Sequence, residues 1–147
     1  MPLGFSVRWP EICVVVGAQA HSSVYKALSV LGLCRERIIL VPADDEGRLR
    51  PDCLPSLDNL TLLILQAGNV NSGAFDSFAE VCERARDTGA WIHVDGAFGL
   101  WAAASRKHSH LTRGVDAADS WSADAHRTLN APYDNGIVFC RNPDTLK

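Results

Sequence analysis

The sequence contains no run of about 18 apolar residues, the length that a membrane-spanning helix requires. Its beginning, MPLGFSVRWPE, lacks the charged and apolar regions of a secretory signal peptide. A strong excess of one charge is also missing, because 14 basic and 17 acidic side chains leave a net charge of −3. That balance is too weak to indicate nucleic acid or an acidic membrane surface as a partner. We therefore expect a protein that neither crosses a membrane nor binds nucleic acid.

Cysteine patterns typical of metal sites and disulfide frameworks are absent as well. The five cysteines are scattered, show no CxxC pairing and have no histidine nearby at zinc spacing: Cys13, Cys34, Cys53, Cys82 and Cys140. An odd, scattered set favours reduced thiols in a cytoplasmic protein, buried as small apolar side chains. We predict no metal site and a cytoplasmic location.

Strand and helix signals alternate along the 147 residues, of which 47% are apolar. Short apolar runs predict strands at 12–16, 37–41, 61–66, 91–94, 119–123 and 137–140. Helices are expected from Ser22 to the stop at Gly32, at 51–57, and from a capping box at Ser77 and Glu80 to Gly89. This alternation predicts a single α/β domain with a mostly parallel sheet and helices on both faces.

Polar residues follow four of the predicted strands. His21 comes after the first strand, Asn69 after the third, Asp95 ends the fourth, and Asp124 with His126 follows the fifth. Because ligands of open α/β sheets collect beyond the carboxyl ends of the strands, these side chains predict a binding site at that edge.

Each of these residues also has an interpretation that needs no ligand. Asp95, followed by the small Gly96 and Ala97, suits the protonated nitrogen of a flat ring, or equally the cap of a turn. His21 could lie on such a ring or begin a helix, and Asn69 could bind a ligand or form a turn. His93 is interpreted as structural.

Four runs of the sequence resemble the group II pyridoxal-phosphate-dependent amino-acid decarboxylases: VVVGAQAHSSVYKALSVLGL, QAGNVNSGAFD, WIHVDGAFGLWAAAS and DSWSADAHRTLNAPYDNGIVF. The match is collinear over nearly the whole chain. It implies that His21 stacks on the pyridine ring of pyridoxal phosphate, that Asp95 pairs with the ring nitrogen and that Ala97 packs on the other face of the ring. His126 matches the histidine near the cofactor phosphate, and Asn69 lies in a loop that lines the cofactor.

The same resemblance places Arg127 where the family has its Schiff-base lysine. A lysine amine can lose its proton and attack a carbonyl, whereas arginine stays protonated and forms no such bond. Arginine could still hold a phosphate or carboxylate through its fork of donors. The resemblance therefore implies the cofactor site without its covalent anchor.

The resemblance also implies the large domain of the type I, aspartate-aminotransferase-like fold, of which residues 1–147 would be a part. We expect the N-terminal phosphate loop and the C-terminal small domain of the family to be absent. Family members are usually homodimers and act on small amino acids. The leading hypothesis is a fragment or degenerate copy of a decarboxylase that is inactive by itself. The alternative is a non-catalytic relative that binds an anion or cofactor or serves as a dimerisation module.

Overall fold

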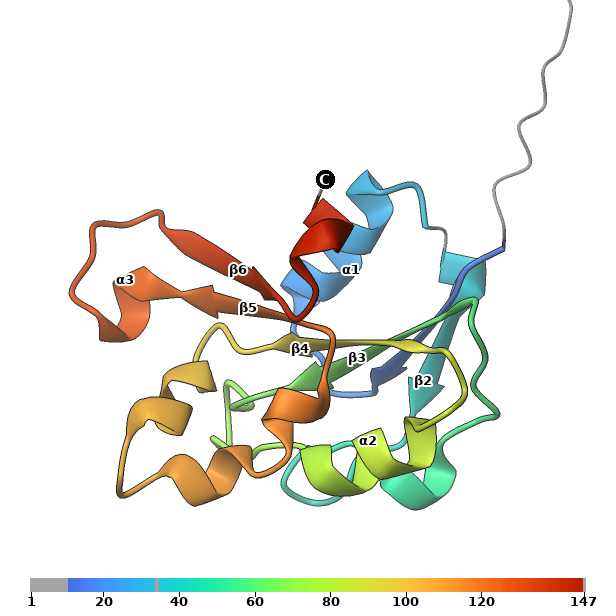
Figure 1. The fold of residues 1–147 in the computed structure, drawn as a ribbon, viewed down its shortest axis with the longest axis horizontal. Coiled ribbons are helices and arrows are strands. Elements are labelled where there is room, and N and C mark those ends of the chain that lie inside the picture. Colours follow the sequence, from blue (N-terminus) through green and yellow to red (C-terminus); the bar gives the residue numbers. More distant parts are fainter. Residues whose placement is uncertain (1–10, 34, 147) are drawn as a thin grey trace, which may run out of the picture.

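The computed structural model describes residues 11–33 and 35–146, which form a six-stranded sheet with helices on both sides (Figure 1). The strand order is β2-β1-β3-β4-β5-β6, and all neighbours are parallel except β5 and β6. The strands are β1 Cys13–Gly17, β2 Ile38–Val41, β3 Thr61–Gln66, β4 Trp91–Asp95, β5 Ser120–Asp124 and β6 Gly136–Cys140. The α-helices are α1 Ser22–Val30, α2 Phe78–Ala85 and α3 Ala125–Thr128. The predicted α/β fold with a mostly parallel sheet is confirmed.

Successive strand side chains point to opposite sides of the sheet, and this alternation divides the core into two layers. The larger layer packs against α2 and includes Val15, Leu63, Leu65, Ile92 and Val94 with Phe78 and Val81. The smaller layer packs against α1 and contains Val14, Val16, Ile64 and Leu28. The two helices lie on opposite sides of the sheet in Figure 1.

Helix α1 leaves part of its side of the sheet open. Its buried partners come from β1 and β3, while β4 and β5 lie farther along the sheet. Because Ile92 and Val94 of β4 are buried on the α2 side, Trp91, His93 and Asp95 face the α1 side. Polar strand residues therefore border an open volume beside α1.

Three local predictions need correction. The expected helix at 51–57 is a single 3-10 turn, Pro51–Cys53, because Pro55 holds Leu54 in an extended conformation with ψ of 134°. Ser77 is the N-cap residue of α2, but its side chain makes no capping hydrogen bond, so the capping box does not form. That helix also ends at Ala85 instead of residue 89, since Arg86 has an extended ψ of 138°. Further 3-10 turns are η1 Arg35–Arg37, η3 Leu100–Ala104, η4 Ser109–Thr112, η5 Val115–Ala117 and η6 Pro143–Leu146.

The cysteines of the described ranges are free thiols, and Cys34 lies outside those ranges. Cys82 is buried in the core layer of α2, where burial raises the pKa of its thiol to about 11. It is thus neutral and packs as a small apolar side chain, as predicted. Cys13, Cys53 and Cys140 are only partly buried, so the prediction of burial is wrong for these three. None of the described helices is long and apolar enough to cross a membrane.

Asp76 is a buried carboxylate that accepts hydrogen bonds from two other segments of the chain. Its Oδ1 accepts a hydrogen bond from the backbone N–H of Leu49 at 2.7 Å, and its Oδ2 accepts one from Gln66 at 2.7 Å. The side chain lies just before α2 and is 7% exposed. Burial raises the pKa of Asp76 to about 6, and the two hydrogen bonds only partly offset that effect. Asp76 therefore anchors the end of β3, from which the loop carrying Asn69 departs.

Candidate functional site

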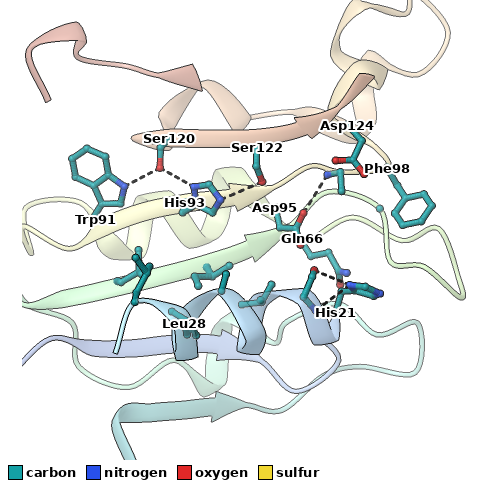
Figure 2. Close-up of a pocket in the computed structure, with 18 of the residues that line it drawn as sticks. His21, Leu28, Gln66, Trp91, His93, Asp95, Phe98, Ser120, Ser122 and Asp124 are labelled. Carbon is teal, nitrogen blue, oxygen red and sulfur yellow. Dashed lines mark hydrogen bonds between the residues drawn. The ribbon is translucent and has the colours of Figure 1, made fainter. Parts of the chain in front are cut away.

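A pocket of about 570 Å³ lies between α1 and strands β3, β4 and β5 (Figure 2). This volume is within the range of small-molecule sites. Of the predicted site residues, the pocket is lined by His21, Asp95, Ala97, Asp124 and Arg127. These residues are distant in sequence and meet because the carboxyl ends of parallel strands share one edge of the sheet.

Asp95 ends β4 and contributes its carboxylate to the pocket lining. Its Oδ1 accepts a hydrogen bond from the backbone N–H of Ala97 at 3.2 Å. Within residues 11–33 and 35–146, no lysine, arginine or histidine forms an ion pair with this carboxylate. The following turn passes close to β5, since a Cβ at Gly96 would lie 2.9 Å from the carbonyl oxygen of Ser122. Asp95 thus stabilises a turn and also presents acceptor capacity to the pocket.

His21 is the N-cap residue of α1, so it does begin a helix, one of the two interpretations that the sequence allowed. Its Nδ1 accepts a hydrogen bond from the backbone N–H of Ser23 at 3.3 Å and lies 2.8 Å from the Ser23 hydroxyl. The imidazole is therefore held at the start of the helix while it lines the pocket. Its capping role and its place in the pocket are compatible.

Arg127 lies on the short helix α3 and lines the pocket. Its Nε donates a hydrogen bond to Oδ2 of Asp124 at 2.6 Å. Its guanidinium carbon also lies 4.1 Å from the centre of the Phe98 ring, a favourable cation–π arrangement. Two neighbours thus fix the side chain, and one of them neutralises its charge.

Asn69 is predicted for the cofactor, but its side chain is buried in the loop after β3 and is outside the pocket lining. Its Oδ1 accepts hydrogen bonds from the backbone of Asn71 at 2.9 Å and Ser72 at 3.3 Å. Its Nδ2 donates to Oε1 of Gln19 at 3.3 Å. In this arrangement Asn69 organises the loop, because both ends of its amide are engaged.

His126 also lies outside the lining of this pocket. Its Nδ1 is 3.2 Å from the backbone nitrogen of Asn135 and 3.0 Å from the carbonyl oxygen of the same residue. The ring makes an edge-to-face contact with Tyr133, with 4.7 Å between centroids. Its Nε2 is buried, has no hydrogen-bond partner among the described residues and lies 3.6 Å from Oδ2 of Asp124. His126 therefore retains one unused polar atom beside the residue that holds Arg127.

His93, which sequence analysis interpreted as structural, lines the pocket on the same side of β4 as Asp95 (Figure 2). The Trp91 indole N–H donates to the Ser120 hydroxyl at 2.9 Å, and that hydroxyl lies 2.8 Å from Nδ1 of His93. Nε2 of His93 lies 3.3 Å from the Ser122 hydroxyl. We call Trp91, Ser120, His93 and Ser122 the strand relay. The period of two along β4 is the signal that could have placed His93 beside Asp95.

The strand relay predicts one tautomer of His93. We expect the Ser120 hydroxyl, which accepts from Trp91, to donate its own proton to Nδ1 of His93, so that Nε2 carries the imidazole proton. Burial lowers the pKa of His93 and outweighs the opposite effect of Asp95. Nitrogen-15 NMR should therefore show a neutral ring with its proton on Nε2 at pH 7. At pH 6.5, about the ordinary pKa of histidine, less than half of the molecules should have the imidazolium form of His93.

The Ser120→Ala variant should lose this preference and show a mixture of tautomers, because the donor to Nδ1 is gone. Ser122→Ala is the matched control within the same relay, and it should retain the Nε2-protonated form. An Nδ1-protonated His93 in the unmodified chain would contradict the proposed order of donors.

Comparison with known proteins identifies the family of this chain. The family model described as the pyridoxal-dependent decarboxylase conserved domain matches residues 10–147. The chain belongs to the pyridoxal-dependent decarboxylase family. The resemblance inferred from the four sequence runs is thereby confirmed.

Similar decarboxylases come from distant organisms. The chain is 35% identical over 136 residues to an aromatic-L-amino-acid decarboxylase of Bacillus atrophaeus, covering 87% of this chain and 28% of that protein. It is 30% identical over 148 residues to a cysteine sulfinic acid decarboxylase of Rattus norvegicus, covering 93% and 29%. The crystal structure of mouse CSAD superposes with a TM-score of 0.84 at 28% identity, covering 94% of this chain and 30% of that one. The chain spans 26–29% of the length of the curated relatives it matches.

Pyridoxal phosphate is the cofactor that membership of the decarboxylase family implies, and the described residues fit it in part. The pocket has room for a flat ring and contains the Asp95 carboxylate, which lacks a cationic partner among the described residues. A protonated ring nitrogen would supply that partner. Position 127, however, carries a guanidinium, which stays protonated and cannot bond covalently to the cofactor's aldehyde. The pocket lining therefore has a carboxylate that suits the ring and contains no lysine that could attach the cofactor.

Proposed function

We propose that this chain is a fragment or degenerate copy of a pyridoxal-phosphate-dependent amino-acid decarboxylase that retains ring-binding side chains and lacks covalent catalysis. The observation that best supports this proposal is the position of Arg127, which lines the same pocket as Asp95. Its Nε lies 2.6 Å from Oδ2 of Asp124, which holds the side chain there. An arginine in this place would occupy the position of the cofactor lysine.

In this proposal, each residue of the site contacts a different part of the cofactor. Asp95 would pair with the protonated ring nitrogen, His21 would stack on one face of the ring and Ala97 would pack against the other. When bound, the ring supplies an electron sink for the bond that breaks as carbon dioxide leaves. Nε2 of His126 is buried, has no hydrogen-bond partner among the described residues and lies 3.6 Å from Oδ2 of Asp124, and we assign it to the phosphate end. Asn69 would shape the loop beside the cofactor.

The side chain at position 127 decides whether this binding can lead to turnover. The guanidinium of Arg127 keeps its proton and its ion pair with Asp124, so it can neither attack a carbonyl nor relay a proton. Loss of one proton-transfer group alone typically lowers rates by about 10² to 10⁴. We propose that the unmodified chain has negligible decarboxylase activity towards amino acids. The test is covalent capture of pyridoxal phosphate at position 127, which should require a lysine there.

We further propose a cytoplasmic protein that self-associates, through either the homodimer interface of the family or the exposed edge of β6. In support of the latter, β6 lies at the end of the strand order, and Val138 and Phe139 are 60% and 42% exposed. An exposed apolar edge strand is a template for pairing with another chain. The same observation favours the alternative of a dimerisation module.

Replacing Val138 with lysine should reduce self-association at the β6 edge. Paired edges would bring the like charges together, and we expect an apparent dissociation constant at least about tenfold weaker. Sedimentation velocity over a concentration series measures this change. Val30→Lys is the matched control, because Val30 is 82% exposed and belongs to α1 instead of β6. Equal weakening by both variants, or by neither, would argue against pairing at this edge.

A further inference from the structure

We propose that the turns between β4 and β5 bind a multiply phosphorylated anion, such as a diphosphate group, through a cluster of basic side chains. We call this cluster the basic turn, and it consists of Arg106, Lys107, His108, His110 and Arg113. The basic turn lies on the same side of the sheet as α2, in the yellow-to-orange part of Figure 1. None of its residues lines the pocket between α1 and strands β3, β4 and β5. The site therefore goes beyond the proposed function.

The local charge of the basic turn differs from the charge of the whole chain. The sequence has no acidic residue between Asp95 and Asp116, whereas the chain has a net charge of −3. All side chains of the basic turn are exposed. Because charges interact in solution over a Debye length of about 8 Å, distant carboxylates do not cancel this local positive charge.

The cations of the basic turn lack the partners that other basic side chains of the chain have. Within residues 11–33 and 35–146, Arg106, Lys107 and Arg113 form no ion pair and no side-chain hydrogen bond. Arginines that pair with a carboxylate are Arg48, Arg50, Arg84, Arg86 and Arg127. The donors of the basic turn are therefore available to a ligand.

Hydrogen bonds within the segment and a close contact with α2 hold the backbone of the basic turn in place. The backbone N–H of Ser109 donates to the carbonyl oxygen of Ser105 at 2.8 Å. The hydroxyl of Thr112, a residue that is 5% exposed, donates to the carbonyl oxygen of Ser109 at 2.9 Å. Gly114 then packs so closely on α2 that a Cβ there would lie 2.6 Å from Cα of Ala79. Because this backbone is already ordered, a ligand would not have to order it on binding.

His110 and Arg113 also border a polar pocket of about 570 Å³ beside α2, which gives the site a concave side. The acidic side chains of that pocket are engaged by other groups. They are Asp76, which accepts from two backbone N–H groups, Glu46, which lies 3.6 Å from Arg48, and Glu80, which lies 3.2 Å from Arg84. None of these carboxylates forms an ion pair with Arg113, so its guanidinium is free to bind an anion at the pocket rim.

The composition of the basic turn favours phosphate as the chemistry of the ligand. The planar guanidinium groups of Arg106 and Arg113 match pairs of phosphate oxygens, and Lys107 adds a compact charge. Several cations in one short segment suit an anion that carries charge on neighbouring phosphates. A single-stranded nucleic acid would also need aromatic side chains on which bases stack, and residues 106–113 contain no phenylalanine, tyrosine or tryptophan. A soluble phosphate compound and a phosphorylated lipid headgroup offer the same chemistry to this site.

The first test compares inorganic pyrophosphate with citrate, two multiply charged anions built on phosphate and on carboxylate groups. Isothermal titration of the unmodified full chain measures both affinities, and two-dimensional NMR maps the site. We expect pyrophosphate to bind at least about fivefold more tightly than citrate and to shift the amide signals of residues 105–114. Equal affinities would overturn the proposal, as would shifts that map to the pocket beside α1.

Vesicles distinguish a lipid headgroup from a soluble compound as the source of the phosphate. The unmodified chain is sedimented with phosphatidylcholine vesicles that contain or lack a phosphatidylinositol bisphosphate. Sedimentation that requires the bisphosphate lipid and is reversed by pyrophosphate would identify the headgroup, whereas pyrophosphate binding without sedimentation would identify a soluble phosphate compound. Both results support the site. Tighter binding of a hexaglutamate peptide or of a single-stranded oligonucleotide than of pyrophosphate would instead indicate an acidic protein or a nucleic acid and overturn the proposal.

The second test removes two cations of the basic turn. The double variant Arg106→Gln and Arg113→Gln should weaken pyrophosphate binding at least about tenfold, because each lysine or arginine near an anionic surface contributes roughly fivefold. The control is the double variant Arg50→Gln and Arg86→Gln, which removes the same charge from ion-paired arginines outside the basic turn. Its affinity should change by less than about twofold, since charges beyond a Debye length are screened. Equal weakening by the two variants would refute the assignment.

Failure of this inference would be distinguishable from failure of the proposed function. Pyrophosphate binding at the basic turn is measured without pyridoxal phosphate, and Arg127→Lys should leave it unchanged. A chain that binds pyrophosphate at the basic turn but does not capture pyridoxal phosphate after Arg127→Lys would refute the cofactor site alone. The reverse result would refute the site at the basic turn alone.

Discussion

Replacing Arg127 with lysine should allow one pyridoxal phosphate to become covalently attached at position 127 after treatment with borohydride. The unmodified chain should show no attachment at this residue. A lysine amine can lose its proton and bond to the aldehyde, whereas the guanidinium of arginine remains protonated. Asp95 in the same pocket would hold the ring while the bond forms. Peptide mapping by mass spectrometry resolves the site, because the natural chain has only three lysines, Lys26, Lys107 and Lys147.

Arg86→Lys is the matched control for this experiment. Arg86 is also an ion-paired arginine, with Glu83 as its partner, and it lies outside the pocket with its side chain 65% exposed. Because a site that orients two reactants raises their effective concentration, position 127 should be labelled at least about tenfold more than position 86. Equal labelling would show that residue 127 does not occupy the place of the cofactor lysine. Release of carbon dioxide from amino acids by the unmodified chain would instead refute the role assigned to Arg127.

Removing the carboxylate of Asp76 should cause the largest loss of stability among the polar substitutions considered. Asp76→Ala leaves the backbone N–H groups of Leu49 and Gln66 without their acceptor. A buried donor without a partner costs about 1–3 kcal/mol, so we expect the free energy of unfolding to fall by about 2–6 kcal/mol. That is a large fraction of the stability of a typical domain, about 5–15 kcal/mol. Urea denaturation followed by circular dichroism measures the loss.

Asp58→Ala is the matched control, since Asp58 also accepts two hydrogen bonds, from Leu60 and Thr61, but is exposed to water. Its loss should cost less than about 1 kcal/mol, because water replaces the missing acceptor. Asp76→Asn retains one acceptor oxygen and should be intermediate. Comparable losses at positions 58 and 76 would contradict the anchoring role of Asp76.

The effect of Asp76→Ala should also depend on pH in a defined direction. The pKa of Asp76 is raised from 3.8 to about 6 on folding, so the folded chain binds more protons than the unfolded chain between these values. The stabilisation linked to this proton is fully present below pH 3.8 and is lost as pH rises through about 6. The stability difference between the natural chain and Asp76→Ala should therefore be larger at pH 4 than at pH 7. A difference that shrinks on acidification would show that the pKa of Asp76 is not raised.

The fold class was predictable because strand and helix signals are local. Runs such as 61–66 are apolar and short, and the intervening segments have helical spacing or turn residues. Helix ends were less predictable, because they depend on backbone angles that neighbours impose. Pro55 shortens the turn at Pro51–Cys53, and the Ser77 hydroxyl does not cap α2 despite suitable spacing.

The gathering of His21, Asp95 and Arg127 was predictable, because the ends of parallel strands share an edge. The directions of side chains in the following loops were not. Asn69 turns into its own loop and His126 turns towards Asn135 and Tyr133, since loop backbone angles set where a side chain points. His93 was accessible to prediction, as it lies two residues before Asp95 on the same strand.

The sequence by itself determined the family, the sheet edge that carries the site and the absence of a lysine at position 127. These follow from residue identity and order, and the inability of a guanidinium to form a covalent bond with an aldehyde does not depend on its surroundings. Only the tertiary structure decided that Asp124 neutralises Arg127, that Asp95 lacks a cationic partner among the described residues, and that His93 joins the strand relay. Electrostatic and hydrogen-bond energies depend on distances between groups, and the fold sets those distances for residues far apart in the chain.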